Sequence, residues 1–332
     1  MNKNRLMVSG AAILLLLSVI YMIGIKNSDT MVAYIPNVDE GTISVIDTKK
    51  DKILRTLKVD NVLSDGIEAS KDGKWIYAGN YSRGELLVID SKTGEIVKRI
   101  DTGKNLHGID MTPDGKYLYL ASGDFKEGKE FNYITVVTTN SHKVVAEIPT
   151  ISKSPSHIDF SRDGSLAYVA NILSNDITLI STETFKIIAT IPVGTIPNEV
   201  EPSTDDKFLY VANVTDGTVS VIDLINRKEI ETIKSGEGTH GLALSADGKF
   251  LFASNRISND LIKVDLDSNE LKGKVLTGKT ANHVSLVPGT DKLYVTNKDS
   301  NDLTVVDTNT MKILSKINLG KTPHEISFAI AK

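Results

Sequence analysis

The chain has 332 residues, of which 40% are hydrophobic and 24% are charged, so its composition is that of a folded protein rather than a disordered one. The formal net charge is −4 and no segment concentrates lysine and arginine, so a nucleic-acid partner is not expected. The absence of cysteine excludes disulfides, thiolate metal sites, iron–sulfur clusters and a catalytic thiol.

The N-terminal segment predicts a membrane anchor. Lys3 and Arg5 precede an uncharged and mostly apolar stretch from Leu6 to Ile25, which has about the length that spans a bilayer as a helix. The positive charges favour a cytoplasmic N-terminus. A cleaved signal peptide is the alternative, but the stretch is long for one and no small-x-small cleavage site follows it. We therefore expect an uncleaved signal anchor, a transmembrane helix, over residues 1–26. Residues 27–332 then form one domain on the extracytoplasmic side, which is the periplasm or the cell surface.

The remainder of the chain repeats one unit seven times. An aromatic residue followed three positions later by Asn or Ser recurs at spacings of 43, 42, 49, 42, 42 and 42 residues. A period of 40 to 45 residues is typical of β-propeller blades. The aromatic residues are Tyr34, Tyr77, Tyr119, Tyr168, Tyr210, Phe252 and Tyr294.

Each unit predicts four antiparallel strands. A first strand such as HGIDMT is followed by a turn such as Asp72-Gly73, the aromatic strand, an alternating β-branched strand such as ISVID, and a last strand. Gly and Asp supply the left-handed conformations that tight hairpins require. The predicted blades cover residues 64–100, 106–150, 155–193, 197–235, 239–277 and 281–319.

The two ends of the repeat region predict how the ring closes. Residues 31–59 supply three strands of a unit whose first strand is missing, and the segment HEISFA, residues 324–329, matches that missing strand. We expect the C-terminal strand to pair beside the N-terminal strands in a shared seventh blade. The predicted fold is therefore an all-β, seven-bladed propeller of four-stranded antiparallel blades.

These motifs resemble the YVTN family of β-propeller repeats, also called YncE-type or surface-layer-type propellers. The motif YVTN itself stands at Tyr294–Asn297, and the resemblance covers residues 31–331. It implies an extracytoplasmic propeller and is specific for the fold rather than for a function. Relatives include the haem-binding propeller of nitrite reductases and propellers that carry metals, so a divalent metal or haem is a possible cofactor implied by the resemblance.

Five of the six histidines fall where one blade passes to the first strand of the next. In a propeller this junction lies at the mouth of the axial channel, where neutral imidazoles could hold a divalent metal or the iron of a haem. The structural alternative is that each histidine bonds neighbouring strands and fixes the blade geometry. The candidate metal ligands are His107, His157, His240, His283 and His324.

Other polar residues share this region of the repeat. Asn198 and Asn282 occupy the position that is histidine in three blades, and four successive first strands carry a carboxylate at one equivalent position. Carboxylates beside histidines suit a divalent ion, although they could also pair with backbone or water in a wet channel. The candidate ligand-binding carboxylates are Glu68, Asp110, Asp159 and Glu201.

Two further features have structural interpretations. The Asn of each YxxN motif and the Asp that ends most β-branched strands are expected to cap turns. The second blade carries a longer loop, residues 122–132, on the face of the five histidines; it is either a binding loop or a tolerated solvated insertion.

The sequence favours a binding protein over an enzyme, because no phosphate loop, zinc-protease motif or nucleophile elbow occurs in it. We expect a membrane-anchored extracytoplasmic propeller that binds or scaffolds a protein, a cell-wall polymer or a small molecule through its loop face and channel mouth. The alternative is a metal- or haem-binding accessory protein or chaperone that uses the histidines. A propeller hydrolase or lactonase is a third hypothesis, motivated only by the carboxylates of the channel.

Overall fold

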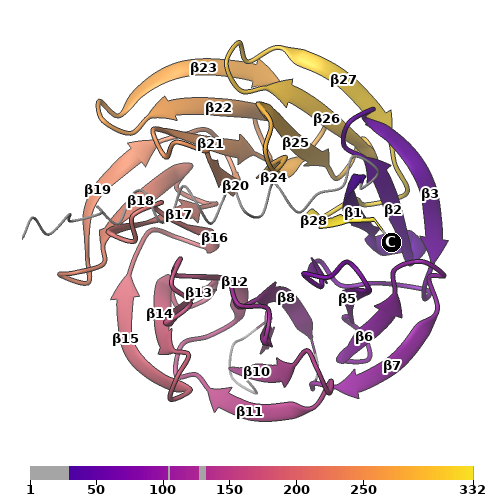
Figure 1. Cartoon of the computed structure of the whole chain (residues 1–332). Helices are drawn as coiled ribbons and strands as arrows, with labels where there is room; N and C mark the ends of the chain where they lie inside the picture. The colour runs from indigo at the N-terminus through magenta and orange to yellow at the C-terminus, as the bar shows by residue number, and fades with distance from the viewer. Residues whose placement is uncertain (1–29, 104, 127–131, 332) are drawn as a thin grey trace, which may run out of the picture.

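The computed structural model describes residues 30–103, 105–126 and 132–331. These residues form seven four-stranded antiparallel sheets around one axis (Figure 1), which confirms the predicted seven-bladed propeller. The predicted anchor, residues 1–26, lies outside the described residues. Among the residues that are described, no helix is long and apolar enough to cross a membrane.

The strands of each blade are named A to D from the axis outward. The A strands are β4 (Ile67–Ala69), β8 (Leu106–Met111), β12 (Pro155–Phe160), β16 (Pro197–Pro202), β20 (Thr239–Leu244), β24 (Ala281–Leu286) and β28 (Ser327–Ile330). The B strands are β1 (Met31–Asn37), β5 (Trp75–Asn80), β9 (Tyr117–Gly123), β13 (Leu166–Asn171), β17 (Phe208–Asn213), β21 (Phe250–Asn255) and β25 (Lys292–Asn297).

The C strands are β2 (Thr42–Asp47), β6 (Glu85–Asp90), β10 (Asn132–Thr138), β14 (Asp176–Ser181), β18 (Thr218–Asp223), β22 (Asp260–Asp265) and β26 (Asp302–Asp307). The D strands are β3 (Lys52–Lys58), β7 (Ile96–Asp101), β11 (Val144–Pro149), β15 (Lys186–Pro192), β19 (Lys228–Lys234), β23 (Glu270–Leu276) and β27 (Ile313–Asn318). Blades one to six begin with β4, β8, β12, β16, β20 and β24, and blade seven has the order β28-β1-β2-β3. A short 3-10 helix, η1 (Val38–Glu40), lies between β1 and β2.

The predicted closure of the ring is confirmed. Strand β28 pairs antiparallel with β1 from Met31 opposite Ile330 to Tyr34 opposite Ser327. The strand was expected to begin at His324 but begins at Ser327. The reason is that residues 324–326 leave the ladder, although the preceding Pro323 still forms an isolated bridge with Asn37.

Neighbouring blades pack through interlocking apolar faces. The aromatic residue of most B strands is fully buried, and between blades seven and one Tyr34 and Ile43 lie in one cluster with Ile76 and Leu87. Burial of apolar surface between blades stabilises the ring, because a single blade would leave both faces exposed to water.

Polar side chains fix the turns as the repeat predicted. The amide of Asn171 donates to Asp176 Oδ1 at 2.8 Å, across the turn between β13 and β14, and Asp47 Oδ1 accepts the backbone N–H of Lys49 at 2.9 Å. Gly73, in the turn between β4 and β5, has φ of 69°, the left-handed conformation expected for it.

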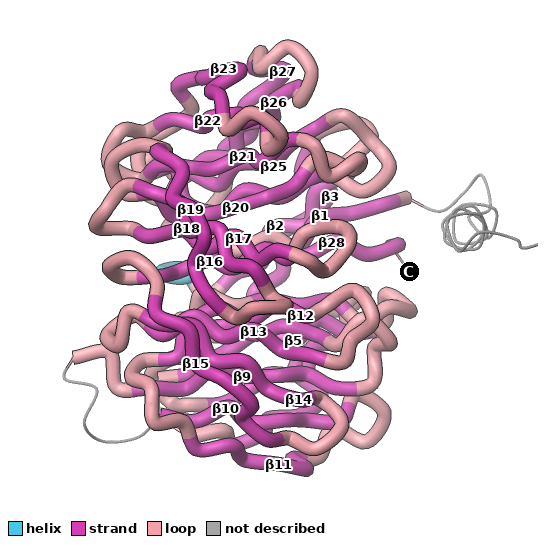
Figure 2. Tube along the Cα trace, turned by 90° about the vertical axis from the view of Figure 1, so that its left-hand side faces the viewer, coloured by secondary structure: helices cyan, strands magenta, loops and turns pink. Residues whose placement is uncertain are grey.

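The loops divide between two faces of the ring (Figure 2). The B–C loops and the D–A connections share one face, here called the mouth face, which includes η1. The A–B and C–D turns lie on the opposite face. Because β1 and β28 are paired ends, Met31 and Ile330 also lie at that opposite face. The candidate histidines precede or begin the A strands and therefore belong to the mouth face.

Candidate functional site: a histidine cluster at the channel mouth

Four of the five candidate histidines lie in a β-bulge at the start of an A strand, and His324 precedes the A strand β28. In blade three Pro155 pairs with Asn171 and Ile158 pairs with Val169, so Ser156 and His157 lie between two registers of the ladder. The same break occurs in β8, β16, β20 and β24. Bulges re-aim side chains and are frequent beside functional sites. Because the A strands surround the axis, the bulged residues of several blades meet there.

The five predicted histidines form one cluster. His283 lies at its centre, with ring centroids 4.9 Å from His157 and 4.8 Å from both His240 and His324. The His107 ring lies 5.0 Å from that of His157. The sequence therefore located the cluster correctly, while the role of these residues as metal ligands stays a prediction.

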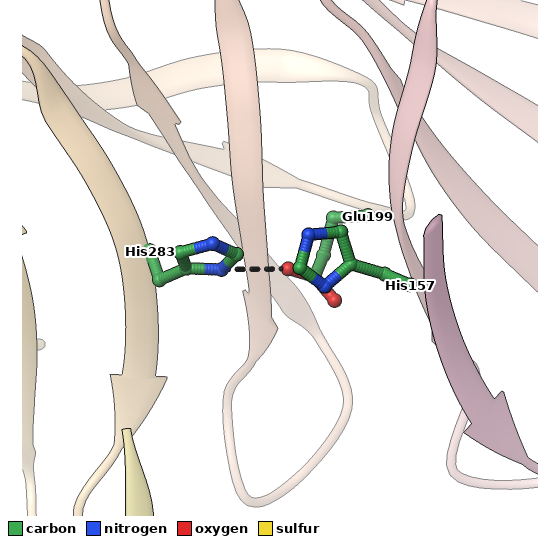
Figure 3. A group of neighbouring side chains, drawn as sticks. All are labelled: His157, Glu199 and His283. Atoms are coloured by element: carbon green, nitrogen blue, oxygen red, sulfur yellow. Dashed lines mark hydrogen bonds and ion pairs between the residues drawn. The ribbon is translucent and has the colours of Figure 1, made fainter. Parts of the chain in front are cut away.

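Carboxylates from other blades contact the imidazoles. His283 Nδ1 lies 3.0 Å from Glu199 Oε2 (Figure 3). His157 Nδ1 lies 2.6 Å from Glu325 Oε1. The carboxylate of Asp65 contacts two histidines: one oxygen lies 3.0 Å from His107 Nε2 and the other lies 3.4 Å from His324 Nε2. Four imidazoles are thus each held through one nitrogen.

The second nitrogen of each of these four imidazoles is buried and has no hydrogen-bond partner in the described part of the chain. These atoms are His107 Nδ1, His157 Nε2, His283 Nε2 and His324 Nδ1. A buried polar atom without a partner is costly, and a bound ion or water would satisfy it. A histidine held by a carboxylate through one nitrogen, with the other nitrogen available, is also the arrangement that orients metal ligands in proteins.

The imidazoles are in the protonation state that metal binding requires. Burial lowers the pKa of both His157 and His283 to about 4, and it lowers the pKa of His240 and His324 well below the ordinary value. Burial by itself would raise the pKa of Asp65, but the adjacent His324 and His107 hold it well below its usual range. At neutral pH His157, His240, His283 and His324 are therefore neutral imidazoles, the form that ligates divalent ions.

The spacing of three residues suits one ion. Ligand atoms of His157, Glu199 and His283 all lie within 4.8 Å of one another. Two imidazoles bound to a tetrahedral ion through bonds of about 2.1 Å have ring centroids roughly 5 Å apart. The observed 4.9 Å between the His157 and His283 rings is close to that value. Imidazole with carboxylate is a donor set that suits zinc, copper or nickel.

The predicted carboxylates lie deeper in the channel. Glu68, Asp110, Asp159 and Glu201 line a cavity of about 200 Å³ together with His157 and His283. Burial raises the pKa of Glu68 and Asp159 to about 7 and that of Glu201 to about 8. For Asp110, burial and the charge of Asp159 raise the pKa well above its ordinary value.

The size of this cavity limits its contents. Pockets for drug-sized ligands have roughly 300 to 1,000 Å³, so about 200 Å³ accommodates an ion with a few waters or a very small molecule. A haem inside the channel does not fit this volume, and a haem could contact the cluster only from the loop side. The buried carboxylates would be stabilised by a cation, because like charges in a low-dielectric site repel one another.

The two predicted asparagines differ in their contacts. Asn198 Nδ2 lies 3.4 Å from His240 Nδ1, so it belongs to the cluster. The Asn282 side chain is fully buried, and neither its oxygen nor its nitrogen has a hydrogen-bond partner among the described residues. Both asparagines are therefore at the mouth, and neither has a demonstrated ligand.

Sequence reasoning missed three residues that organise the cluster: Asp65, Glu199 and Glu325. A signal was present, because all three occupy the same two positions of the repeat as the histidines. Their partners come from distant blades, however; Glu325 of blade seven contacts His157 of blade three. Periodicity shows which positions face the axis but not which pairs meet across it.

The remaining predicted features are also located. His142, the sixth histidine, lies away from the cluster, with Nε2 3.2 Å from the Tyr77 hydroxyl. The described part of the long second-blade loop contributes Phe125, whose ring centroid lies 5.0 Å from that of His107. Residues 127–131 of that loop lie outside the described residues.

Comparison with known proteins agrees with this fold. A family model described as YNCE-like beta-propeller matches residues 111–330, and a model described as Cytochrome D1 heme domain matches residues 21–104. The uncharacterized protein YncE of Salmonella typhimurium is 25% identical over 180 residues, which are 52% of this chain and 48% of that protein. The aligned region is thus only about half the length of this curated relative.

Solved structures share the architecture at low sequence identity. Hydrazine synthase of Kuenenia stuttgartiensis superposes with a TM-score of 0.74 at 19% identity, covering 84% of this chain and 92% of that one. Dihydro-heme d1 dehydrogenase NirN superposes with a TM-score of 0.66 at 14% identity, covering 89% of this chain and 74% of that one. At such identities the likeness concerns the fold alone.

Proposed function

The chain belongs to the YNCE-like β-propeller family, and we propose that it is an extracytoplasmic binding protein whose channel mouth holds a divalent transition-metal ion. The observation that carries the proposal is the set of four imidazoles, each held by a carboxylate through one nitrogen and with a buried, partnerless nitrogen at the other position. His157 and His283 are the proposed ligands through their Nε2 atoms, Glu199 holds His283 at Nδ1, and His240 and His324 lie adjacent.

Different residues at the mouth have different roles in the proposed metal binding. Glu325 holds His157 through Nδ1, so an ion at Nε2 meets an oriented lone pair. Burial keeps His157 and His283 neutral, and a bound cation would favour ionisation of the deeper carboxyl groups, whose pKa values burial raises. The apolar segment at residues 6–25 supports membrane anchoring, which would present this site outside the cytoplasm.

Isothermal titration of the full-length chain with Zn²⁺, Cu²⁺ and Ni²⁺ tests the proposal. We expect one high-affinity site, lost in the double variant His157→Asn/His283→Asn. Asparagine retains an N–H near the Nδ1 position for Glu325 and Glu199 but removes the second nitrogen. His142→Asn is the matched control, because His142 lies outside the cluster and has φ of 52°, which asparagine tolerates. Unchanged binding in the double variant would contradict the proposal.

Haem binding is the second candidate, favoured by the match of residues 21–104 to the Cytochrome D1 heme domain. Since the cavity has only about 200 Å³, a haem would lie on the mouth face and approach a histidine from outside. Visible spectroscopy during addition of haem distinguishes the two candidates. A Soret shift that His283→Asn abolishes would favour haem, whereas an unshifted spectrum combined with zinc binding would exclude it.

A further inference from the structure

Two cations stand beside the histidine cluster in neighbouring blades. Arg256 directly follows Asn255, which pairs with Thr239, so it lies next to the strand that carries His240. Lys298 has the equivalent position in blade six, because Asn297 pairs with Ala281, the residue before Asn282. The corresponding residues of the other five blades are uncharged: Val38, Tyr81, Gly123, Ile172 and Val214. At this position of the repeat, positive charge is therefore found only in blades five and six.

Neither cation has a hydrogen bond or salt bridge from its side chain within the described ranges. Arg256 is half-buried, and burial lowers its pKa. The charge of Arg256 is also among the causes that lower the pKa of His240. The charge of Lys298 likewise contributes to lowering the pKa of Asp65. Both charges thus act on the cluster itself. The carboxylates of Asp65 and Asp299 act on the charge of Arg256, but neither forms a salt bridge with it in the described residues, and the planar guanidinium suits a further carboxylate.

A pocket of about 380 Å³ opens on another side of the same mouth. It is lined by Val62, Tyr81 and Phe125, and by Asp65 and His107 of the cluster. Its volume falls within the range of small-molecule sites, and its aromatic and aliphatic walls suit a carbon skeleton. Asp65 links this pocket to the side of the mouth that carries Arg256 and Lys298. It lines the pocket, and it interacts electrostatically with both cations.

We propose that the channel mouth binds a small organic carboxylate, with its acid group on Arg256 and Lys298 and its carbon part against Tyr81 and Phe125. The inference rests on the proposed function in one respect: the ligand would lie beside the metal ion, whose charge strengthens its binding. Arg256 and Lys298 suffice to hold the acid group without the ion. The buried amide of Asn282, which has no partner among the described residues, offers a further hydrogen bond on that side.

Titration of the chelator-treated full-length chain with 3-phenylpropionate tests the inference, with 3-phenylpropylamine as the probe of opposite charge. We expect the acid to bind and the amine not to bind. Arg256→Gln should weaken the acid about tenfold or more, since a charge-assisted hydrogen bond contributes about 1.5–3 kcal/mol. Phe125→Ala should also weaken it. Arg83→Gln, which changes an exposed arginine of a B–C loop on the same face, should have no effect.

The outcomes separate this inference from metal binding. Equal affinity for acid and amine, or wild-type affinity in Arg256→Gln, would overturn it even if zinc binds normally. Equal binding of inorganic phosphate would overturn the assignment to an organic ligand. Arg256→Lys, which keeps the charge but lacks the fork, should retain part of the affinity. Zinc affinity in a buffer without carboxylates should not fall in Arg256→Gln, because removing a positive charge cannot weaken a cation site.

Discussion

At the scale of residues, the mouth depends on a proton shared between a histidine and a carboxylate. Burial raises the pKa of Glu325 to about 8, so in the metal-free protein the proton between Glu325 and His157 remains bound at neutral pH. An ion at Nε2 requires Nδ1–H on the imidazole and an ionised carboxylate. Metal binding should therefore release protons, and the apparent affinity should rise with pH up to about 8.

Glu325→Gln tests this coupling. The amide oxygen can still accept from Nδ1–H but carries no charge, and loss of such a partner typically lowers metal affinity 10–100-fold. We expect a loss of about that size at pH 8, with less proton release, both measured by calorimetry in buffers of different ionisation enthalpy. Glu85→Gln, at the rim where Glu85 pairs with Arg99, is the control. Wild-type affinity and proton release in Glu325→Gln would show that the contact is only structural.

Residue identities predicted the membership of the cluster better than its contacts. Two adjacent repeat positions were enough to bring His107, His157, His240 and His283 to one opening. It was not enough to pair His283 of blade six with Glu199 of blade four, since that contact depends on the diameter of the ring. In four of the imidazoles the second nitrogen lacks a partner among the described residues because of how the blades pack, and this packing cannot be read from the sequence.

At the scale of elements, the bulge in strand A is the feature that periodicity did not reveal. Alternation over six residues predicts a strand but does not show whether one residue is inserted in it. A weak signal existed in the second bulge position, which is glycine in blades one, two and five. In blade two a Cβ on Gly108 would lie 2.1 Å from the backbone oxygen of Ser156. Adjacent bulges therefore touch, and their shapes are coupled around the mouth.

Gly108→Ala should distort two neighbouring bulges. The φ of Gly108 is not positive, so the alanine backbone is unstrained and the cost comes from the contact with blade three. We expect a destabilisation of about 2 kcal/mol, within the range for a steric clash in a packed region, and weaker zinc binding because His107 and His157 shift. Denaturant unfolding and calorimetry measure the two effects. The exposed change Glu237→Ala serves as control, and a neutral Gly108→Ala would mean that the bulges move independently.

At the scale of the whole molecule, the channel gathers buried carboxylic acids from four blades. The folded-state pKa of Asp159 is raised to about 7 and that of Glu201 to about 8, above their unfolded values. Groups with a raised pKa stabilise the fold at low pH, and this contribution is lost as pH rises through the folded-state value. The lowered pKa values of His157 and His283 affect a different pH range, because they reduce the stability of the folded protein only below about pH 6.5.

The metal-free protein should therefore become less stable between pH 6.5 and pH 9. Differential scanning calorimetry in the presence of chelator should show a Tm that falls across this interval. Asp159→Asn should reduce the slope because one titrating group is removed, and saturating Zn²⁺ should reduce it further by favouring the ionised forms. A Tm that is constant or rises with pH would show that the carboxyl groups are ionised without cost.

The topology of the ring also predicts how an anchored molecule presents its mouth. β1 begins at the face opposite the histidine cluster, so a membrane segment preceding it would direct the mouth away from the bilayer (Figure 2).

The chain has no cysteine, so a single introduced thiol can carry a fluorophore without competition. Ile225→Cys, in the C–D turn after β18, should be quenched by spin-labelled lipid headgroups in liposomes, because that turn lies on the membrane side. Ile151→Cys, in the connection between β11 and β12, should not be quenched. Both side chains are highly exposed, at 77% and 97%, so neither substitution disturbs the core. The reverse pattern would mean that the mouth faces the lipid, and equal absence of quenching would contradict anchoring by residues 1–26.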